Sequence, residues 1–110
     1  MIKKLVTLAA LAMLLGSPTS YAVFFLGNTL VEKCESDNFY DQGMCTGFVL
    51  GVSDINDRKF SCPPQNGTVS DAQMVKVVRK YLEEHPEKLH NTGHLLVGTA
   101  LYQAFPCPDD

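Results

Sequence analysis

The sequence predicts a small all-α domain in which four helices are stapled by two disulfides. Three observations favour this class. Apolar residues recur at helical spacing in four separate segments. An apolar leader at the N-terminus indicates export, and four cysteines follow it. An even number of cysteines in a short exported chain is typical of a disulfide framework, which stabilises a domain whose core alone is marginal.

The leader has the three parts of a secretory signal peptide, and we assign it to residues 1–22. Two lysines give a positive start, residues 5–15 form an uncharged apolar run, and small residues lead up to Ala22. We expect cleavage after Ala22, release into the periplasm, and one mature domain over residues 23–110. The alternative is an uncleaved anchor, but the apolar run is too short to span a bilayer.

The charge of the mature domain excludes some partners. Nine Lys and Arg, less the two in the leader, stand against twelve Asp and Glu, which gives a net charge of −5. No basic patch with interleaved aromatic residues is present, so we expect no nucleic acid partner. An acidic surface suits a basic protein partner instead. No nucleophile elbow or glycine-rich phosphate loop occurs, so we expect neither an enzyme nor a cofactor, and no membrane contact after cleavage.

The first two helices are expected over residues 27–35 and 40–57. Asn28 is the expected N-cap of the first helix. Its apolar stripe consists of Leu26, Leu30, Val31 and Cys34. The second helix also has an apolar stripe at helical spacing, which we expect to face the core. That stripe consists of Met44, Phe48, Val52 and Ile55.

Glycine recurs every four residues along the second helix, at Gly43, Gly47 and Gly51. Each glycine costs a helix roughly 1 kcal/mol relative to alanine, so we expect the close approach of another helix to offset the loss. We favour a close contact inside the monomer over the alternative, a seam between two copies. Asp54 is a lone carboxylate near these glycines, and we interpret it as a solvated charge near the helix end rather than a catalytic acid.

The third helix has the clearest start and follows a loop at residues 58–69. Ser70 is its expected N-cap and Gln73 stands three residues later, which is the pattern of a capping box. Its core face consists of Met74, Val77, Val78, Tyr81 and Leu82. Pro86 ends this helix at the preceding residue. As a first-turn residue it also begins a fourth helix, which we expect to run to Ala104.

The expected disulfides are Cys34–Cys45 and Cys62–Cys107. In an up-down-up-down arrangement the first two cysteines lie at one end of the domain and the last two at the other. Joining Cys45 to Cys62 would require the chain to climb back about 18 Å along the second helix in five residues, at 1.5 Å per residue. Joining Cys34 to Cys62 would connect opposite ends of the first helix. Zinc is the rival use of the cysteines, but no C-x-x-C pair is present.

His90 and His94 are four residues apart on the expected fourth helix, a spacing that suits a metal ion. A third ligand is missing, because Asn91 stands where the H-E-x-x-H pattern has its glutamate. We therefore expect no metal site and interpret both as surface histidines. The alternative is an acid sensor, since imidazoles titrate near pH 6.5.

Four segments together resemble a known family. They are CTGFVLGVSD at 45–54, FSCP at 60–63, YLEEHPE at 81–87, and AL followed by AFPC within 100–107. In this order they resemble the Rap/Tai group, the periplasmic immunity proteins against amidase effectors of type VI secretion systems. The resemblance covers residues 30–107. It implies a helical homodimer that binds a cognate amidase effector and blocks its active-site cleft. The cysteines, the glycines and Asp54 match as framework residues, whereas toxin-contacting residues do not carry over.

We expect the partner surface on the loop at residues 63–69, because binding residues concentrate on loops held by rigid scaffolds. Cys62 pins one end, Ser70 fixes the other, and Pro63 and Pro64 restrict the backbone. The polar side chains expected to reach a partner are Gln65, Asn66 and Thr68. The alternative is a plain connector. A second functional class also stays open, a periplasmic stress protein resembling the small helical acid-stress chaperones.

Overall fold

The structure, a computed structural model, describes residues 24–109. Its elements are α2 (Gly27–Glu35), α3 (Phe39–Asn56), α4 (Asp71–Glu84), the 3₁₀ turn η1 (Pro86–Lys88) and α5 (Gly93–Ala104). Within the described residues, β structure is limited to two isolated bridges. The all-α, four-helix class is therefore confirmed. The expected signal peptide and its cleavage site lie outside the described residues.

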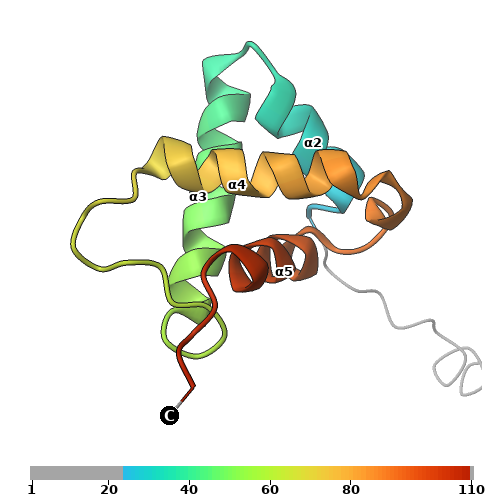
Figure 1. Ribbon diagram of the computed structural model, residues 1–110. Coiled ribbons are helices and arrows are strands. Elements are labelled where there is room, and N and C mark those ends of the chain that lie inside the picture. The colour runs from blue at the N-terminus through green and yellow to red at the C-terminus, as the bar shows by residue number, and fades with distance from the viewer. Residues whose placement is uncertain (1–23, 110) are drawn as a thin grey trace, which may run out of the picture.

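The helices cross one another and do not form the expected up-down-up-down arrangement. Figure 1 shows α4 lying across α3, with α5 beneath α4 and running back in the opposite direction. Each of these four helices contacts the other three. The connection at residues 57–70 explains the difference, because its length leaves α4 free to turn away from the axis of α3. The short connection between α2 and α3 keeps those two as neighbours.

The core lies where the helices cross, and each helix contributes to it. Its fully buried apolar side chains are Leu30, Val49, Val78, Val97 and Leu101. Burial of each such side chain stabilises the fold by about 1.5–3 kcal/mol. The core face expected for α4 is confirmed, with Met74, Tyr81 and Leu82 also buried and Val77 half-buried. The core therefore depends on contacts between all four helices rather than on one pair.

The face of α3 that meets the core matches the expected one only in part, since Phe48 and Val52 pack against the core cluster as expected. Cys45, Val49 and Ser53 are buried, whereas Ile55 is 74% exposed and Met44 is 37% exposed. The disulfide explains the rotation, because Cys45 must face α2 to reach its partner. The buried stripe is therefore shifted by one residue around the helix, which leaves the side chains of Met44 and Ile55 at the surface.

The fourth helix begins seven residues later than expected, at Gly93. Pro86 starts only the short turn η1. The segment between η1 and α5 runs beside residues 25–27. The backbone amide of Gly27 donates to the carbonyl of Asn91 at 2.8 Å, and the backbone amide of Gly93 donates to the carbonyl of Phe25 at 2.8 Å. These bonds use backbone groups that a continuous helix would have paired internally, so the helix breaks here.

The start of α2 is fixed by the same contacts. Its N-cap is Leu26, and no side chain caps it, so the expectation of an Asn28 cap is wrong. The amide of Asn28 instead donates to the carbonyl of Leu89 at 2.9 Å. A Cβ at Gly27 would lie 2.7 Å from that same carbonyl oxygen. Glycine is therefore required for α2 to approach this segment so closely.

The predicted start of α4 is confirmed. The Ser70 side chain accepts a hydrogen bond from the amide of Gln73 at 3.2 Å, which satisfies one of the helix's unpaired donors. Val69 packs against the core cluster that contains Met74, as a hydrophobic staple requires. The end of the long connection is therefore held both by a polar cap and by an apolar contact.

Candidate functional site

Both predicted disulfides are present, and they anchor the two connections on either side of α3. Cys34–Cys45 joins Cα atoms 5.0 Å apart across 11 residues of sequence. Cys62–Cys107 joins Cα atoms 4.8 Å apart across 45 residues. The amide of Cys62 also donates to the carbonyl of Phe105 at 2.7 Å. The long connection is therefore tied to the end of α5 by a covalent bond and a backbone hydrogen bond.

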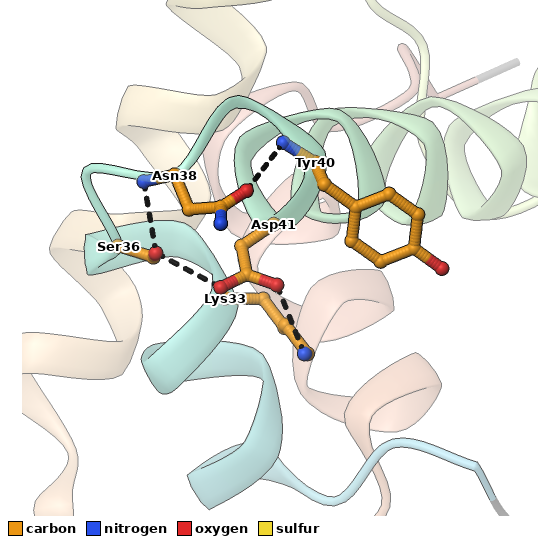
Figure 2. A network of polar contacts seen from close by, with 5 residues as sticks. All are labelled: Lys33, Ser36, Asn38, Tyr40 and Asp41. Carbon is orange, nitrogen blue, oxygen red and sulfur yellow. Dashed lines mark hydrogen bonds and ion pairs between the residues drawn. The ribbon is translucent and has the colours of Figure 1, made fainter.

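A polar network closes the corner between α2 and α3 (Figure 2). The Lys33 ammonium lies 3.0 Å from Asp41 Oδ1, and the Ser36 hydroxyl donates to Asp41 Oδ2 at 2.9 Å. The hydrogen bond from Lys33, followed by that from Ser36, holds the pKa of the Asp41 carboxyl below its ordinary value. The hydrogen bond to Asp41 in turn raises the pKa of Lys33. The corner is thus held by its own polar side chains.

The start of α3 completes this corner. Asn38 Oδ1 accepts from the amide of Tyr40 at 2.8 Å, which caps the helix. The amide of Asn38 donates to the Ser36 hydroxyl at 3.1 Å. Figure 2 shows the ring of Tyr40 extending away from the network, and this side chain is 72% exposed. The aromatic ring of Tyr40 is therefore free for a contact outside the corner.

The long connection begins with a tight turn over residues 57–61. Arg58 has φ +61°, a left-handed conformation that is uncommon for residues other than glycine. Its amide donates to the carbonyl of Ser61 at 2.9 Å, its guanidinium lies 3.2 Å from Asp57, and it also donates to the carbonyl of Pro63. Arg58 therefore holds together the first part of the connection, from Asp57 to Pro63.

The rest of this connection projects from the helices (Figure 1). Residues 64–68 are exposed, and Gly67 has φ +72°. Asn66 and Thr68 bond to each other, since the Thr68 hydroxyl donates to Asn66 Oδ1 at 2.7 Å. Gln65 takes part in no hydrogen bond found within residues 24–109. Two of the three polar side chains expected to meet a partner thus shape the loop, and Gln65 is left as the free one.

The three glycines of α3 lie on its exposed side. A Cβ added at Gly43, Gly47 or Gly51 would meet nothing within 4 Å. The favoured interpretation, a close contact inside the monomer, is therefore wrong. The close contacts are made at Gly27 and at Gly93, where a Cβ would lie 2.9 Å from the Phe25 carbonyl. We call the exposed side of the helix the α3 face; its residues are Tyr40, Gly43, Met44, Gly47, Gly51, Asp54 and Ile55.

The structure also shows a surface hollow that the sequence did not reveal. Phe60 and Tyr102 line it together with the C-terminal segment around Cys107. Both aromatic side chains are more than half exposed. Because Cys107 is bonded to Cys62, the hollow adjoins the anchored end of the long connection. In the sequence, Phe60 stands two positions before Cys62, but this spacing does not tell whether an aromatic ring is buried or exposed.

The histidines are separated by the break before α5. His90 lies in the turn that follows η1, and His94 lies in the first turn of α5. Both are exposed, and the expected i,i+4 relation on one helix is absent because His90 is not helical. The described part of the chain contains no group of three or more potential metal ligands. Asp54 is exposed on the α3 face.

The family comparison covers all of these features. The chain matches the model of the Rap1a immunity proteins over residues 26–107, from the start of α2 to the last cysteine. The chain belongs to the Rap1a immunity protein family. A search of curated proteins finds no match. Membership agrees with the resemblance seen in the sequence.

Membership in the Rap1a immunity protein family implies binding to a cognate secreted effector. Immunity proteins of this kind are generally non-catalytic, because they act by occupying their target. Among residues 24–109, no helix is both long enough and apolar enough to cross a bilayer. The long connection, the α3 face and the hollow beside Cys107 are exposed surface features of the described residues.

Proposed function

We propose that this protein is a periplasmic immunity protein that binds and inhibits a peptidoglycan amidase effector of a type VI secretion system. The observation that carries the proposal is the family match across the whole disulfide-stapled domain, residues 26–107. The amidase would otherwise cut peptide crosslinks in the cell's own peptidoglycan. The apolar leader and the two disulfides support action in the periplasm, since disulfides persist in oxidising compartments.

Inhibition of this kind requires shape and hydrogen bonds rather than a reactive group. Association costs translational and rotational freedom, and a rigid surface avoids the additional cost of ordering loops. Here the disulfides and the Ser70 cap order the long connection before the partner arrives. The family match also favours this function over the acid-stress chaperone, which would act by exposing apolar surface at low pH.

The test is protection of cells against a candidate amidase. An amidase encoded beside this protein is the first candidate, and it is exported to the periplasm of a host cell with or without this protein. We expect lysis with the amidase alone and growth when the full chain, including residues 1–22, is present. A catalytically inactive amidase controls for export stress. Lysis despite both proteins, or equal protection by a chain without residues 1–22, would contradict the proposal.

We place the inhibitory contact on the long connection, at Pro63, Pro64, Gln65, Asn66 and Thr68. Its support is geometric. The segment is exposed, anchored at Cys62 and Ser70, and shaped internally by the Asn66–Thr68 hydrogen bond. A segment held in this way presents Gln65 to a polar cleft with little loss of conformational entropy.

We also propose that the domain is a homodimer with the α3 face as its seam. The three glycines leave a strip without side chains, and they serve no close contact within residues 24–109. Beside them, Tyr40 and Ile55 are each more than 70% exposed. Crossing two antiparallel copies at Gly47 brings Gly43 of one copy opposite Gly51 of the other, because both lie four residues from the crossing point. The same symmetry brings Tyr40 opposite Asp54, where a phenol can donate to a carboxylate.

Sedimentation of the wild type and of Gly47→Leu tests the seam. We expect a dimer at micromolar concentration for the wild type and at least tenfold weaker association for Gly47→Leu, which is about 1.4 kcal/mol. Helicity should be retained, since nothing lies within 4 Å of a Cβ added at Gly47. Lys80→Leu, on the exposed side of α4, is the control. A monomeric wild type would rule out the dimer, and a dimeric Gly47→Leu would move the seam elsewhere.

A further inference from the structure

A small apolar pocket lies between α2, α4 and η1, away from the long connection and the α3 face. Its volume is about 110 Å³. Its apolar walls are formed by Val31, Cys34, Leu82, Pro86 and Leu89. An apolar cavity of about 150 Å³ binds a molecule of the size of benzene. A pocket of this volume therefore fits one aliphatic side chain and little more.

The walls of this pocket are held in place by contacts outside it. Leu89 is tied to α2 by the hydrogen bond from the Asn28 amide at 2.9 Å. Cys34 is held by its disulfide. The turn before Pro86 is held by His85, whose Nδ1 lies 2.7 Å from the Tyr81 carbonyl oxygen. The pocket is thus preformed, and a side chain that enters it causes little ordering of the protein.

The rim of the pocket carries an excess of negative charge. Glu35 and Glu83 line it and are exposed. Neither carboxylate belongs to an ion pair found among the described residues. Arg79 is the third charged side chain at the rim, and its Nε is buried with no hydrogen-bond partner among residues 24–109. Two unpaired carboxylates therefore face a partner across an apolar opening, which favours a basic residue there.

We propose that this pocket receives one Leu, Ile or Met side chain of the effector, from a segment in which Lys or Arg flanks that side chain. The proposal rests on the proposed function, since it names the effector as the partner. The apolar walls bury the hydrocarbon, while Glu35 and Glu83 pair with the flanking cation. Binding energy concentrates where an anchor side chain fills a desolvated pocket and polar groups surround it.

The pocket and the long connection fit within one interface. They lie at opposite ends of α4, whose 14 residues span about 20 Å. A standard interface buries about 800 Å² on each partner, which is roughly 30 Å across. The separation between Ser70 and Leu82 along the helix is therefore smaller than the width of one such interface.

Short peptides test the pocket without any effector. The protein, isolated with both disulfides formed, is titrated with acetylated Lys-Leu-Lys, Lys-Ala-Lys and Glu-Leu-Glu amides up to about 10 mM. The methyl NMR signals of Val31, Leu82 and Leu89 report binding. We expect the Lys-Leu-Lys peptide to bind at least about tenfold more tightly than either of the others, since three buried carbons and two charge contacts separate them. Equal affinity for all three, or no saturable shift at these methyls, overturns the proposal.

Matched variants show whether the effect belongs to the pocket. Val31→Phe fills it, and Val77→Phe makes the same change at a half-buried valine outside it. We expect only Val31→Phe to abolish the peptide preference, with helicity retained. Glu35→Gln with Glu83→Gln should remove the preference for lysine flanks, whereas Glu87→Gln, at an exposed carboxylate that does not line the pocket, should not. A preference that survives Val31→Phe overturns the proposal.

The effector identified by the protection experiment provides the second arm. We expect Val31→Phe to weaken its binding at least tenfold relative to wild type, and Val77→Phe to leave it unchanged. Equal binding by wild type and Val31→Phe overturns the pocket proposal and leaves the immunity function intact. Failure of wild type to protect, together with a positive peptide titration, removes the immunity function and leaves the pocket as a site for an aliphatic side chain with basic neighbours.

Discussion

The two connections that flank α3 are built alike but used differently. Each lies beside a disulfide and ends in a side-chain N-cap, Asn38 for α3 and Ser70 for α4. The first spans residues 36–38, where the Ser36 hydroxyl accepts from the backbone amide of Asn38 and donates to Asp41. The second spans residues 57–70, and residues 64–68 are exposed. The difference teaches that a disulfide beside a short connection accompanies a closed corner, whereas a disulfide beside a long connection leaves an exposed segment.

The largest expected effect comes from removing either disulfide. We compare Cys34→Ala with Cys45→Ala against Cys62→Ala with Cys107→Ala. By loop-closure entropy the first pair stabilises by about 3 kcal/mol and the second by about 4 kcal/mol, and buried sulfur adds to the first. Both variants should therefore unfold at much lower temperature. Limited proteolysis separates them, because only loss of Cys62–Cys107 should speed cleavage within residues 63–69. Equal cleavage in both variants would break the comparison.

The two N-caps should have smaller and similar effects. Ser70→Ala and Asn38→Ala each remove an observed bond to a helix amide and should destabilise the domain by about 1 kcal/mol. Urea unfolding measures both. The comparison predicts that Ser70→Ala also weakens effector binding, since it loosens one end of the presented connection, and that Asn38→Ala does not. Effector binding that falls in both variants would remove that distinction.

The smallest expected effect is the acid response of the corner. The pKa of Asp41 is lowered in the folded state by its bonds from Lys33 and Ser36. Its contribution is therefore fully present above its unfolded pKa, near 4, and is lost as pH falls through the lower folded value. Asp41→Asn should flatten the decline of stability below pH 4, while Asp37→Asn, an exposed neighbour, should not. Identical acid denaturation curves for wild type and Asp41→Asn would show that the network contributes nothing.

Much of the scaffold could be predicted from the sequence because its signals are local. The capping pattern at Ser70 was sufficient to find the start of α4. Both disulfides were also predicted correctly, although the up-down-up-down arrangement used to argue them is not the observed one. The rotation of α3 was missed, since the buried stripe includes Ser53 and is less apolar than the expected one, and the bond from Cys45 decides between them. Spacing alone also cannot tell a glycine that permits contact, such as Gly27, from one that faces outward, such as Gly47.

The candidate contact surfaces were predictable only in part. The exposed connection was found from its prolines and polar residues. The pocket between Val31 and Leu89 was missed because Val31 was assigned to an apolar core stripe, and a gap beside it depends on how closely α2 approaches the turn after α4. Such distances between elements are set by tertiary packing, for which single-sequence patterns hold no signal.

The most direct test of the central claim is the affinity of the effector amidase for a variant of the long connection. Gln65, Asn66 and Thr68 are changed together to Ala, with Asp37→Ala in the short connection as the control, and binding is measured by calorimetry. We predict a loss of at least about 1.4 kcal/mol for the triple variant, with an unchanged unfolding temperature, and no loss for Asp37→Ala. A loss below about 0.5 kcal/mol, the usual scatter for surface changes, would contradict the claim that this connection is the presented surface.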